Sequence, residues 1–73
     1  MTPADKLLDA RDLEPPEPLE HTLAALDELQ PEQRLRLLLL REPYPLYGIL
    51  DNHGFHHETA LLPDGYYEIL IWR

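Results

Sequence analysis

The stretch LLDARDLEPPEPLEHTLAALDEL, residues 7–29, decides the fold. It begins with a short apolar segment, continues into a loop containing Pro15, Pro16 and Pro18, and ends in an amphipathic pattern. Each proline lacks an amide donor and restricts the residue before it to extended geometry, so the loop can be neither helix nor central strand. The stretch predicts a strand over residues 6–11 and a helix that begins near Pro18. Its apolar stripe contains Leu19, Leu23 (or Thr22), Leu26 and Leu29, and Gln30 and Pro31 end it.

Alternation and turn residues predict the remaining elements. RLRLLLL, residues 34–40, starts with period two and is bounded by prolines, so we expect a strand although leucine favours helices. Pro45 opens a second helix over residues 45–53, which Gly54 ends. Residues 55–62 and 66–72 form a hairpin, because Pro63-Asp64-Gly65 suits a three-residue loop that pairs Leu62 with Tyr66.

The predicted order is therefore β-α-β-α-β-β in a single domain, residues 1–73. Both β-α-β crossovers should be right-handed, which places the two helices on one face of the sheet. This is an α/β fold of the α+β two-layer sandwich type. The hairpin register sends His57, Thr59 and Leu61 to one face of the sheet, and His56, Glu58 and Ala60 to the other.

Composition excludes several classes of function. The chain has no cysteine, which removes disulfides, thiolate metal sites and cysteine catalysis. Its net charge is -8, and residues 1–33 hold nine acidic against two basic residues, a net of -7. Nucleic acid and anionic membranes are therefore not expected partners. No apolar run could span a bilayer, and MTPADK lacks the apolar region of a signal peptide, so we expect a cytoplasmic protein.

Four pieces of the sequence resemble the bacterial domain-of-unknown-function family 2249. They are LDARDLEPPEPL (8–19), LLLLREPYPLYGIL (37–50), HGF (53–55) and the terminal hairpin. That family is similar to the TusA-like (SirA-like) sulfur-carrier fold. The resemblance implies a mixed four-stranded sheet of order 1-2-4-3, with strand 4 antiparallel to the others, and a redox or sulfur-related setting. Where TusA-like carriers hold a cysteine-proline pair, this chain has Leu13-Glu14-Pro15-Pro16, so persulfide transfer is excluded for the chain acting alone.

Charged and aromatic residues cluster in the loops after the first three strands. We expect a candidate binding edge there, since ligands of α/β folds favour the ends of strands where helices begin. Arg11 and Arg41 are possible anion ligands, and Arg41 is expected to bridge the two proline loops. The alternative is that both arginines only pair with Glu14, Asp12 or Glu42 and hold the two loops together. The candidate residues are Arg11, Asp12, Glu14, Arg41, Glu42, Tyr44, Tyr47 and Asp64.

The sheet face away from the helices is a second candidate. If Leu35, Leu37 and Leu39 point towards the helices, then Leu38 and Leu40 point away, together with Leu70 and Trp72. Contiguous exposed Leu and Trp side chains are typical of an interaction surface, so we expect a protein partner or self-association there. The alternative is that residues 1–5 mask this patch, or that Arg36, Glu58 and Glu68 interrupt it.

Neither a metal site nor a catalytic centre is evident. His53, His56 and His57 are close in sequence, but the hairpin register sends His56 and His57 to opposite faces, so no complete ligand set is expected. No nucleophile motif or phosphate-binding glycine loop occurs, and no cofactor is expected. We therefore interpret the chain as a small acidic binding or interaction module. The alternative is a non-catalytic accessory or carrier subunit of an enzyme complex.

Overall fold

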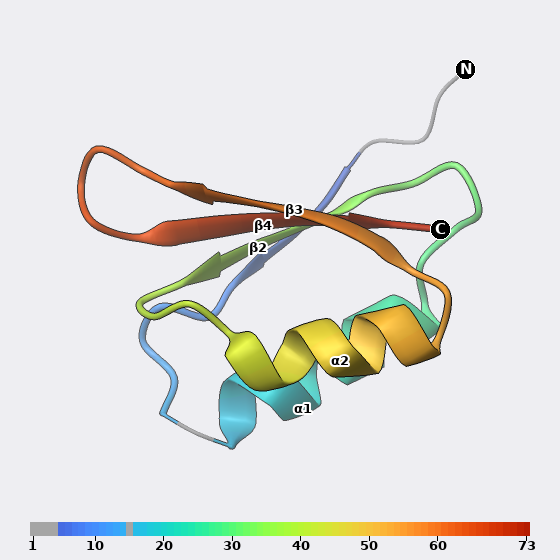
Figure 1. The fold of residues 1–73 in the computed structure, drawn as a ribbon, viewed down its shortest axis with the longest axis horizontal. Helices are drawn as coiled ribbons and strands as arrows, with labels where there is room; N and C mark the ends of the chain where they lie inside the picture. The colour runs from blue at the N-terminus through green and yellow to red at the C-terminus, as the bar shows by residue number, and fades with distance from the viewer. Residues whose placement is uncertain (1–4, 15) are drawn as a thin grey trace.

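The strands and helices follow the predicted order in a computed structural model that describes residues 5–14 and 16–73 (Figure 1). The elements are β1 (Lys6–Asp9), α1 (Glu17–Asp27), β2 (Leu35–Leu39), α2 (Tyr44–Asn52), β3 (His56–Leu61) and β4 (Tyr67–Trp72). Most boundaries differ from the predicted ones by one or two residues, and α1 ends earlier than expected. Pro15 and residues 1–4 lie outside the described residues. Residues 1–4 make up most of the N-terminal arm that, in the alternative interpretation, masks the outer sheet face.

The four strands form one mixed sheet in the order β1-β2-β4-β3. β1 runs parallel to β2, and β4 runs antiparallel to both β2 and β3, so the order implied by the family resemblance is confirmed. The hairpin register is also as predicted. The amide of Leu62 donates to the Tyr66 carbonyl at 2.8 Å, and the amide of Gly65 donates to the Leu62 carbonyl at 2.9 Å. The turn therefore fixes which residues of β3 and β4 face the helices.

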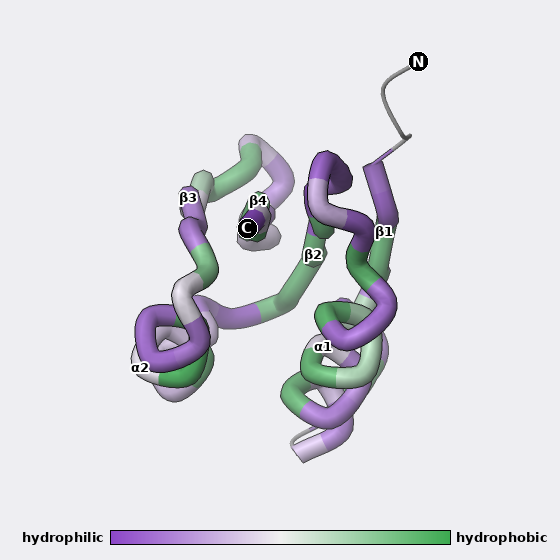
Figure 2. The backbone as a smooth tube through the Cα atoms, turned by 90° about the vertical axis from the view of Figure 1, so that its right-hand side faces the viewer, coloured by the Kyte–Doolittle hydropathy of each residue, from purple (hydrophilic) through white to green (hydrophobic). Residues whose placement is uncertain are grey.

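Both helices cover the same face of the sheet, α1 against β2 and α2 against β3 (Figures 1 and 2). β2 supplies the centre of the core, because its alternate side chains enter the space between the layers. Leu35, Leu37 and Leu39 are buried, whereas Arg36 is exposed and Leu38 is half-buried. The wholly buried side chains that pack around β2 are Leu50, Ile69 and Ile71. The prediction of alternating faces for β2 is confirmed.

The apolar stripe of α1 contains Thr22 and not Leu23. Thr22 is 1% exposed, whereas Leu23 is 37% exposed. Burying a hydroxyl costs little here because it donates to the Pro18 carbonyl at 2.7 Å. The expected end of the helix at Gln30 was also wrong: α1 ends at Asp27, although Leu29 still packs in the core. No helix in the described part of the chain is long and apolar enough to cross a membrane.

Candidate functional site

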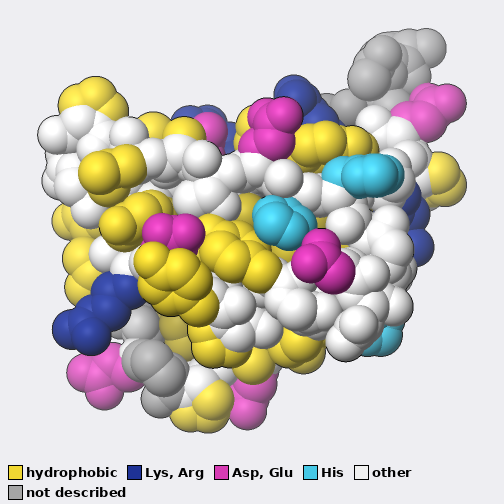
Figure 3. Space-filling model, in the orientation of Figure 1, with side chains coloured by type: hydrophobic (Ala, Val, Ile, Leu, Met, Phe, Trp, Pro, Cys, Tyr) yellow, Lys and Arg dark blue, Asp and Glu magenta, His cyan; other side chains and the backbone are white. Residues whose placement is uncertain are grey.

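A groove lies where β1 and β2 end and where both helices begin. Its volume is about 750 Å³. Both proline loops line it, together with side chains from β2 and the two helices: Ala10, Leu13, Glu14, Pro16, Pro18, Leu19, Thr22, Leu39, Leu40, Arg41, Glu42, Pro43, Pro45 and Leu46. Figure 3 shows hydrophobic side chains gathered over the half of the molecule that carries these loops. The groove is therefore an apolar cleft with charged groups near its margin.

A repeated proline pattern builds the walls of the groove. Pro16-Glu17-Pro18 leads into α1 and Pro43-Tyr44-Pro45 leads into α2, so each helix begins on the same Pro-x-Pro spacing. Proline suits the first turn of a helix, because the amide that it lacks would have no partner there. From the sequence these prolines were expected to stiffen the loops and to open the two helices, and none of them was placed in a site. The shared spacing ahead of both helices is the signal that could have found them.

The first turn of α2 offers few free donors to an anion. The Tyr44 amide donates to the Glu42 carbonyl at 3.1 Å, and the Leu46 amide donates to the Pro43 carbonyl at 2.9 Å. Pro45 has no amide hydrogen. A helix N-terminus binds anions through free amide donors. The start of α2 is therefore a wall for apolar groups and a poor phosphate or carboxylate site.

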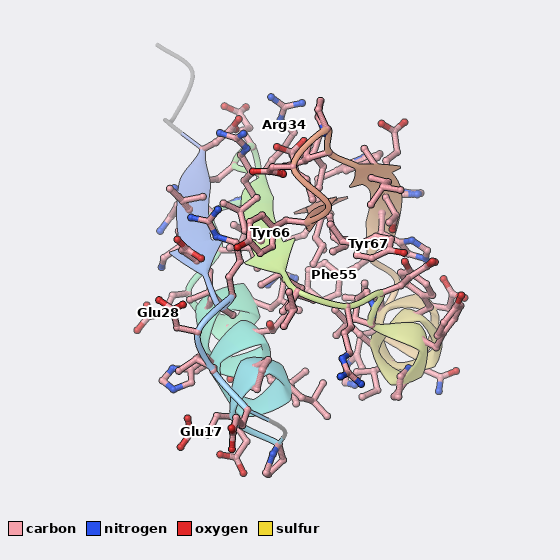
Figure 4. All side chains as sticks on the ribbon, turned by 90° about the vertical axis from the view of Figure 1, so that its left-hand side faces the viewer. Glu17, Glu28, Arg34, Phe55, Tyr66 and Tyr67 are labelled. Atoms are coloured by element: carbon pink, nitrogen blue, oxygen red, sulfur yellow. The ribbon has the colours of Figure 1, made fainter. Side chains whose placement is uncertain are left out.

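The start of α1 is no better suited to an anion. The Glu17 amide donates to the Glu14 carbonyl at 3.0 Å, and Pro18 has no amide hydrogen. The acidic residues Glu17 and Glu20 lie in the first turn, where their charge opposes that of an incoming anion. Figure 4 shows the end of the molecule at which both helices begin. Glu17 is labelled at the start of α1, and α2 lies beside α1 in this view.

Three of the predicted loop residues meet at the groove: Glu14, Arg41 and Glu42. Arg41 is exposed and makes no ion pair with any residue in 5–14 or 16–73, so the expected bridge between the two loops is not seen there. Asp12 is exposed and does not line the groove. Two carboxylates against one arginine make the margin acidic.

Tyr47 joins α2 to β3 and lies outside the groove lining. Its hydroxyl donates to the Glu42 carboxylate at 3.1 Å and is 2.6 Å from the Thr59 hydroxyl. Its ring stacks on His57 at 4.8 Å, and Tyr44 meets it edge-on at 6.2 Å. Burial raises the pKa of Tyr47, and the negative charge of Glu42 raises the pKa of Tyr44. Tyr47 therefore joins α2 to β3, and Tyr44 packs against Tyr47 on the same helix.

Arg11 lies on the opposite side of the sheet from the helices. Its guanidinium donates two hydrogen bonds to Asp9, at 2.7 and 2.9 Å, and lies 4.8 Å from the centre of the Tyr66 ring. The alternative interpretation paired Arg11 with Asp12 or Glu14. Its partner is Asp9 instead, because residues two apart at the end of a strand share a face. The hydrogen bonds with Asp9 raise the pKa of Arg11, and the charge of Asp64 acts in the same direction. Arg11 is therefore paired with Asp9 and does not line the groove.

The Asp9–Arg11 pair predicts an effect in acid. Hydrogen bonds from Arg11 lower the pKa of Asp9 from 3.8 to about 2. A carboxyl whose pKa is lower in the folded than in the unfolded chain stabilises the fold above the unfolded pKa, and this contribution is lost as the pH falls from about 4 through about 2. We expect Arg11→Gln to return the pKa of Asp9 towards 3.8 in a carboxyl-carbon NMR titration. Arg34→Gln is the control, and an Asp9 pKa still near 2 in Arg11→Gln would contradict the assignment.

The histidines occupy separate environments. His56 stacks on Trp72 at 5.8 Å, whereas Nε2 of His57 lies 3.4 Å from the Asp51 carboxylate. Their Cα partners across the hairpin, Trp72 and Ile71, are adjacent residues of β4, so the two side chains leave the sheet on opposite faces as predicted. Within residues 5–14 and 16–73, no three histidine or carboxylate side chains are placed to hold a metal ion.

The predicted apolar residues on the outer sheet face are partly accessible. Leu38, Leu70 and Trp72 are half-buried there, whereas Leu40 follows the end of β2, is 55% exposed and lines the groove. An ion pair between Arg36 and Glu68 lies among them, so the surface mixes apolar and charged side chains.

The comparisons with known proteins agree with the sequence resemblance. The family model described as "Uncharacterized conserved protein (DUF2249)" matches residues 7–73. The match includes both proline loops, the groove and the terminal hairpin. Neither a curated protein nor a solved structure matches the chain.

Proposed function

The chain belongs to the DUF2249 family, and from this premise and the geometry of its groove we propose that it is a protein-binding module. The partner is a segment that carries apolar side chains interleaved with lysine or arginine. The observation that supports this function is the apolar groove between the two proline loops, with Glu14 and Glu42 at its margin.

The shape and the lining of the groove favour an apolar side chain of the partner as the group that enters it. Clefts of about 300–1,000 Å³ are typical of binding sites, and leucine and proline walls release water when an apolar side chain covers them. The first turns of the two helices offer few amide donors, so a phosphate or carboxylate would lose hydration without replacement.

Charge favours a basic segment around that apolar group. Residues 1–33, which supply Glu14 and the first wall of the groove, have a net charge of -7. Lysines and arginines beside the entering apolar side chains would meet this charge, which speeds association and excludes acidic partners. The same module acts as an accessory subunit where the partner is an enzyme. A sulfur-related setting then depends on the partner's chemistry, because this chain has no cysteine.

Three labelled peptides of about twelve residues test the proposal by fluorescence anisotropy. The first has leucines at helical spacing with lysines between them, the second replaces the lysines with glutamates, and the third replaces the leucines with serines. We expect only the first to bind, more weakly as salt rises from about 0.05 to about 0.5 M, because the charge contribution is screened. Equal binding of the first and third peptides would show unspecific charge attraction and would contradict a groove site.

Charge reversal at the groove supplies the matched variants. Glu14→Lys should weaken binding of the basic peptide about fivefold, since an exposed charge contact contributes up to about 1 kcal/mol. Glu32→Lys makes the same charge change at an exposed residue outside the groove lining and should have a clearly smaller effect. An equal loss of affinity in both variants would mean that the peptide senses only the net charge, and the groove assignment would be wrong.

A further inference from the structure

A chain of hydrogen bonds through Tyr47 connects the margin of the groove to β3. The Tyr47 hydroxyl donates to Oε2 of Glu42 at 3.1 Å and lies 2.6 Å from the Thr59 hydroxyl. A phenol carries one proton, so while Tyr47 donates to Glu42, Thr59 must be the donor to Tyr47. Burial raises the pKa of Tyr47, so its hydroxyl keeps this proton at neutral pH. The chain therefore runs from Thr59 through Tyr47 to Glu42, which is the member that lines the groove.

β3 also holds the ring of Tyr47. His57 stacks on this ring with the two ring centres 4.8 Å apart and an angle of 12° between the ring planes. His57 and Thr59 are two residues apart in β3, so their side chains leave the sheet on the same face. β3 therefore contacts Tyr47 at both its ring and its hydroxyl, which restricts the direction from which that hydroxyl reaches Glu42.

The hydrogen-bond donor that holds Glu42 is uncharged. Its second neighbour, Tyr44, is also a neutral hydroxyl, and the charge of Glu42 raises the pKa of Tyr44. Lysine or arginine instead holds four other carboxylates in ion pairs, which cancels their charge: Asp5, Asp9, Glu28 and Glu68. The other margin carboxylate, Glu14, is exposed, and no hydrogen bond to its side chain occurs among residues 5–14 and 16–73. Glu42 is therefore the margin carboxylate that keeps its charge and is also held in place.

We propose that Tyr47 is a positioning residue of the groove, which holds the Glu42 carboxylate where a lysine or arginine of the bound segment can pair with it. This inference rests on the proposed function and assigns the selection of a basic segment to Glu42 and its support. Tyr47 does not line the groove, so it acts through Glu42. A carboxylate has about four acceptor sites, so the bond from Tyr47 leaves capacity for a basic group. A carboxylate that is already ordered loses less conformational freedom when the segment binds, which favours binding.

The peptide with leucines at helical spacing and lysines between them tests this role. Tyr47→Phe keeps the ring that stacks on His57 and removes the hydroxyl, so its affinity for the peptide should fall about threefold. Thr59→Val removes the donor to Tyr47 and should lower the affinity by a smaller factor. Tyr66→Phe removes a hydroxyl beside Arg11, on the other face of the sheet, and should leave the affinity unchanged. In a Glu42→Gln background, Tyr47→Phe should have no further effect, because the charge that Tyr47 positions is gone.

NMR relaxation of the Glu42 side chain in the free protein separates a positioning role from a merely structural one. The methylene groups of Glu42 should become more mobile in Tyr47→Phe and stay unchanged in Tyr66→Phe, while circular dichroism shows both variants folded. Unchanged Glu42 mobility in Tyr47→Phe, or the same loss of affinity with and without Glu42→Gln, would overturn the positioning role. If Glu42 becomes mobile in Tyr47→Phe but the parent binds no peptide, the proposed function is wrong, and the selection of a basic segment by Glu42 is wrong with it.

Discussion

Leu37→Ala should lower the free energy of unfolding by about 2–5 kcal/mol, the usual cost of removing a large side chain from a close-packed core. Leu37 is wholly buried, and its neighbours across the strands are Leu8 of β1 and Ile69 of β4. A domain of this length is stabilised by only about 4–11 kcal/mol in total. The substitution therefore removes a large part of the stability and leaves a measurable unfolded population under mild conditions.

Urea denaturation followed by circular dichroism and by Trp72 emission measures this loss. Leu61→Ala is the matched control, because Leu61 is a leucine of the same sheet that is 64% exposed. Its expected cost is within about 0.5 kcal/mol. Similar costs for the two substitutions would show that β2 is not the centre of the core, and the layer arrangement would have to be revised.

Much of the fold was predictable because local signals and tertiary packing agree. The alternation in residues 34–39 identified the buried leucines of β2, and Pro63-Asp64-Gly65 fixed the hairpin register. The exchange of Leu23 for Thr22 shows where this agreement ends. Hydrophobicity favours Leu23, but α1 packs with Thr22 towards the core, and a hydrogen bond to the Pro18 carbonyl makes that burial possible. Which face of a helix is buried depends on tertiary packing, and a local sequence pattern does not determine it.

The candidate site was less predictable because it depends on distances between segments. The sequence placed Glu14, Arg41 and Glu42 at one end of the sheet, and the structure brings them to one groove. It could not show that Arg11 turns to the other face and pairs with Asp9, since the direction of that side chain depends on where β1 ends. It also could not show a groove, whose volume depends on the spacing between the two helices.

Gly65→Ala and Gly48→Ala should change stability in opposite directions, although they are the same substitution. Gly65 closes the hairpin with a φ of +89°, which side chains of L-residues rarely adopt, and its amide donates to the Leu62 carbonyl. Alanine there should cost about 1–2 kcal/mol of stability. Gly48 lies inside α2, outside the left-handed region, so alanine should add about 0.5–1 kcal/mol by restricting the unfolded chain.

Steric contact cannot explain such a difference, because a Cβ atom added at either glycine would meet no atom within 4 Å apart from its chain neighbours and, at Gly48, the backbone of its own helix. Backbone geometry alone therefore separates the two variants. Thermal and urea denaturation of both proteins measure the two changes against the parent. If Gly65→Ala were as stable as the parent, the turn would not need its left-handed residue. The pairing of Leu62 with Tyr66, from which the facing of every residue in β3 and β4 follows, would then need another cause.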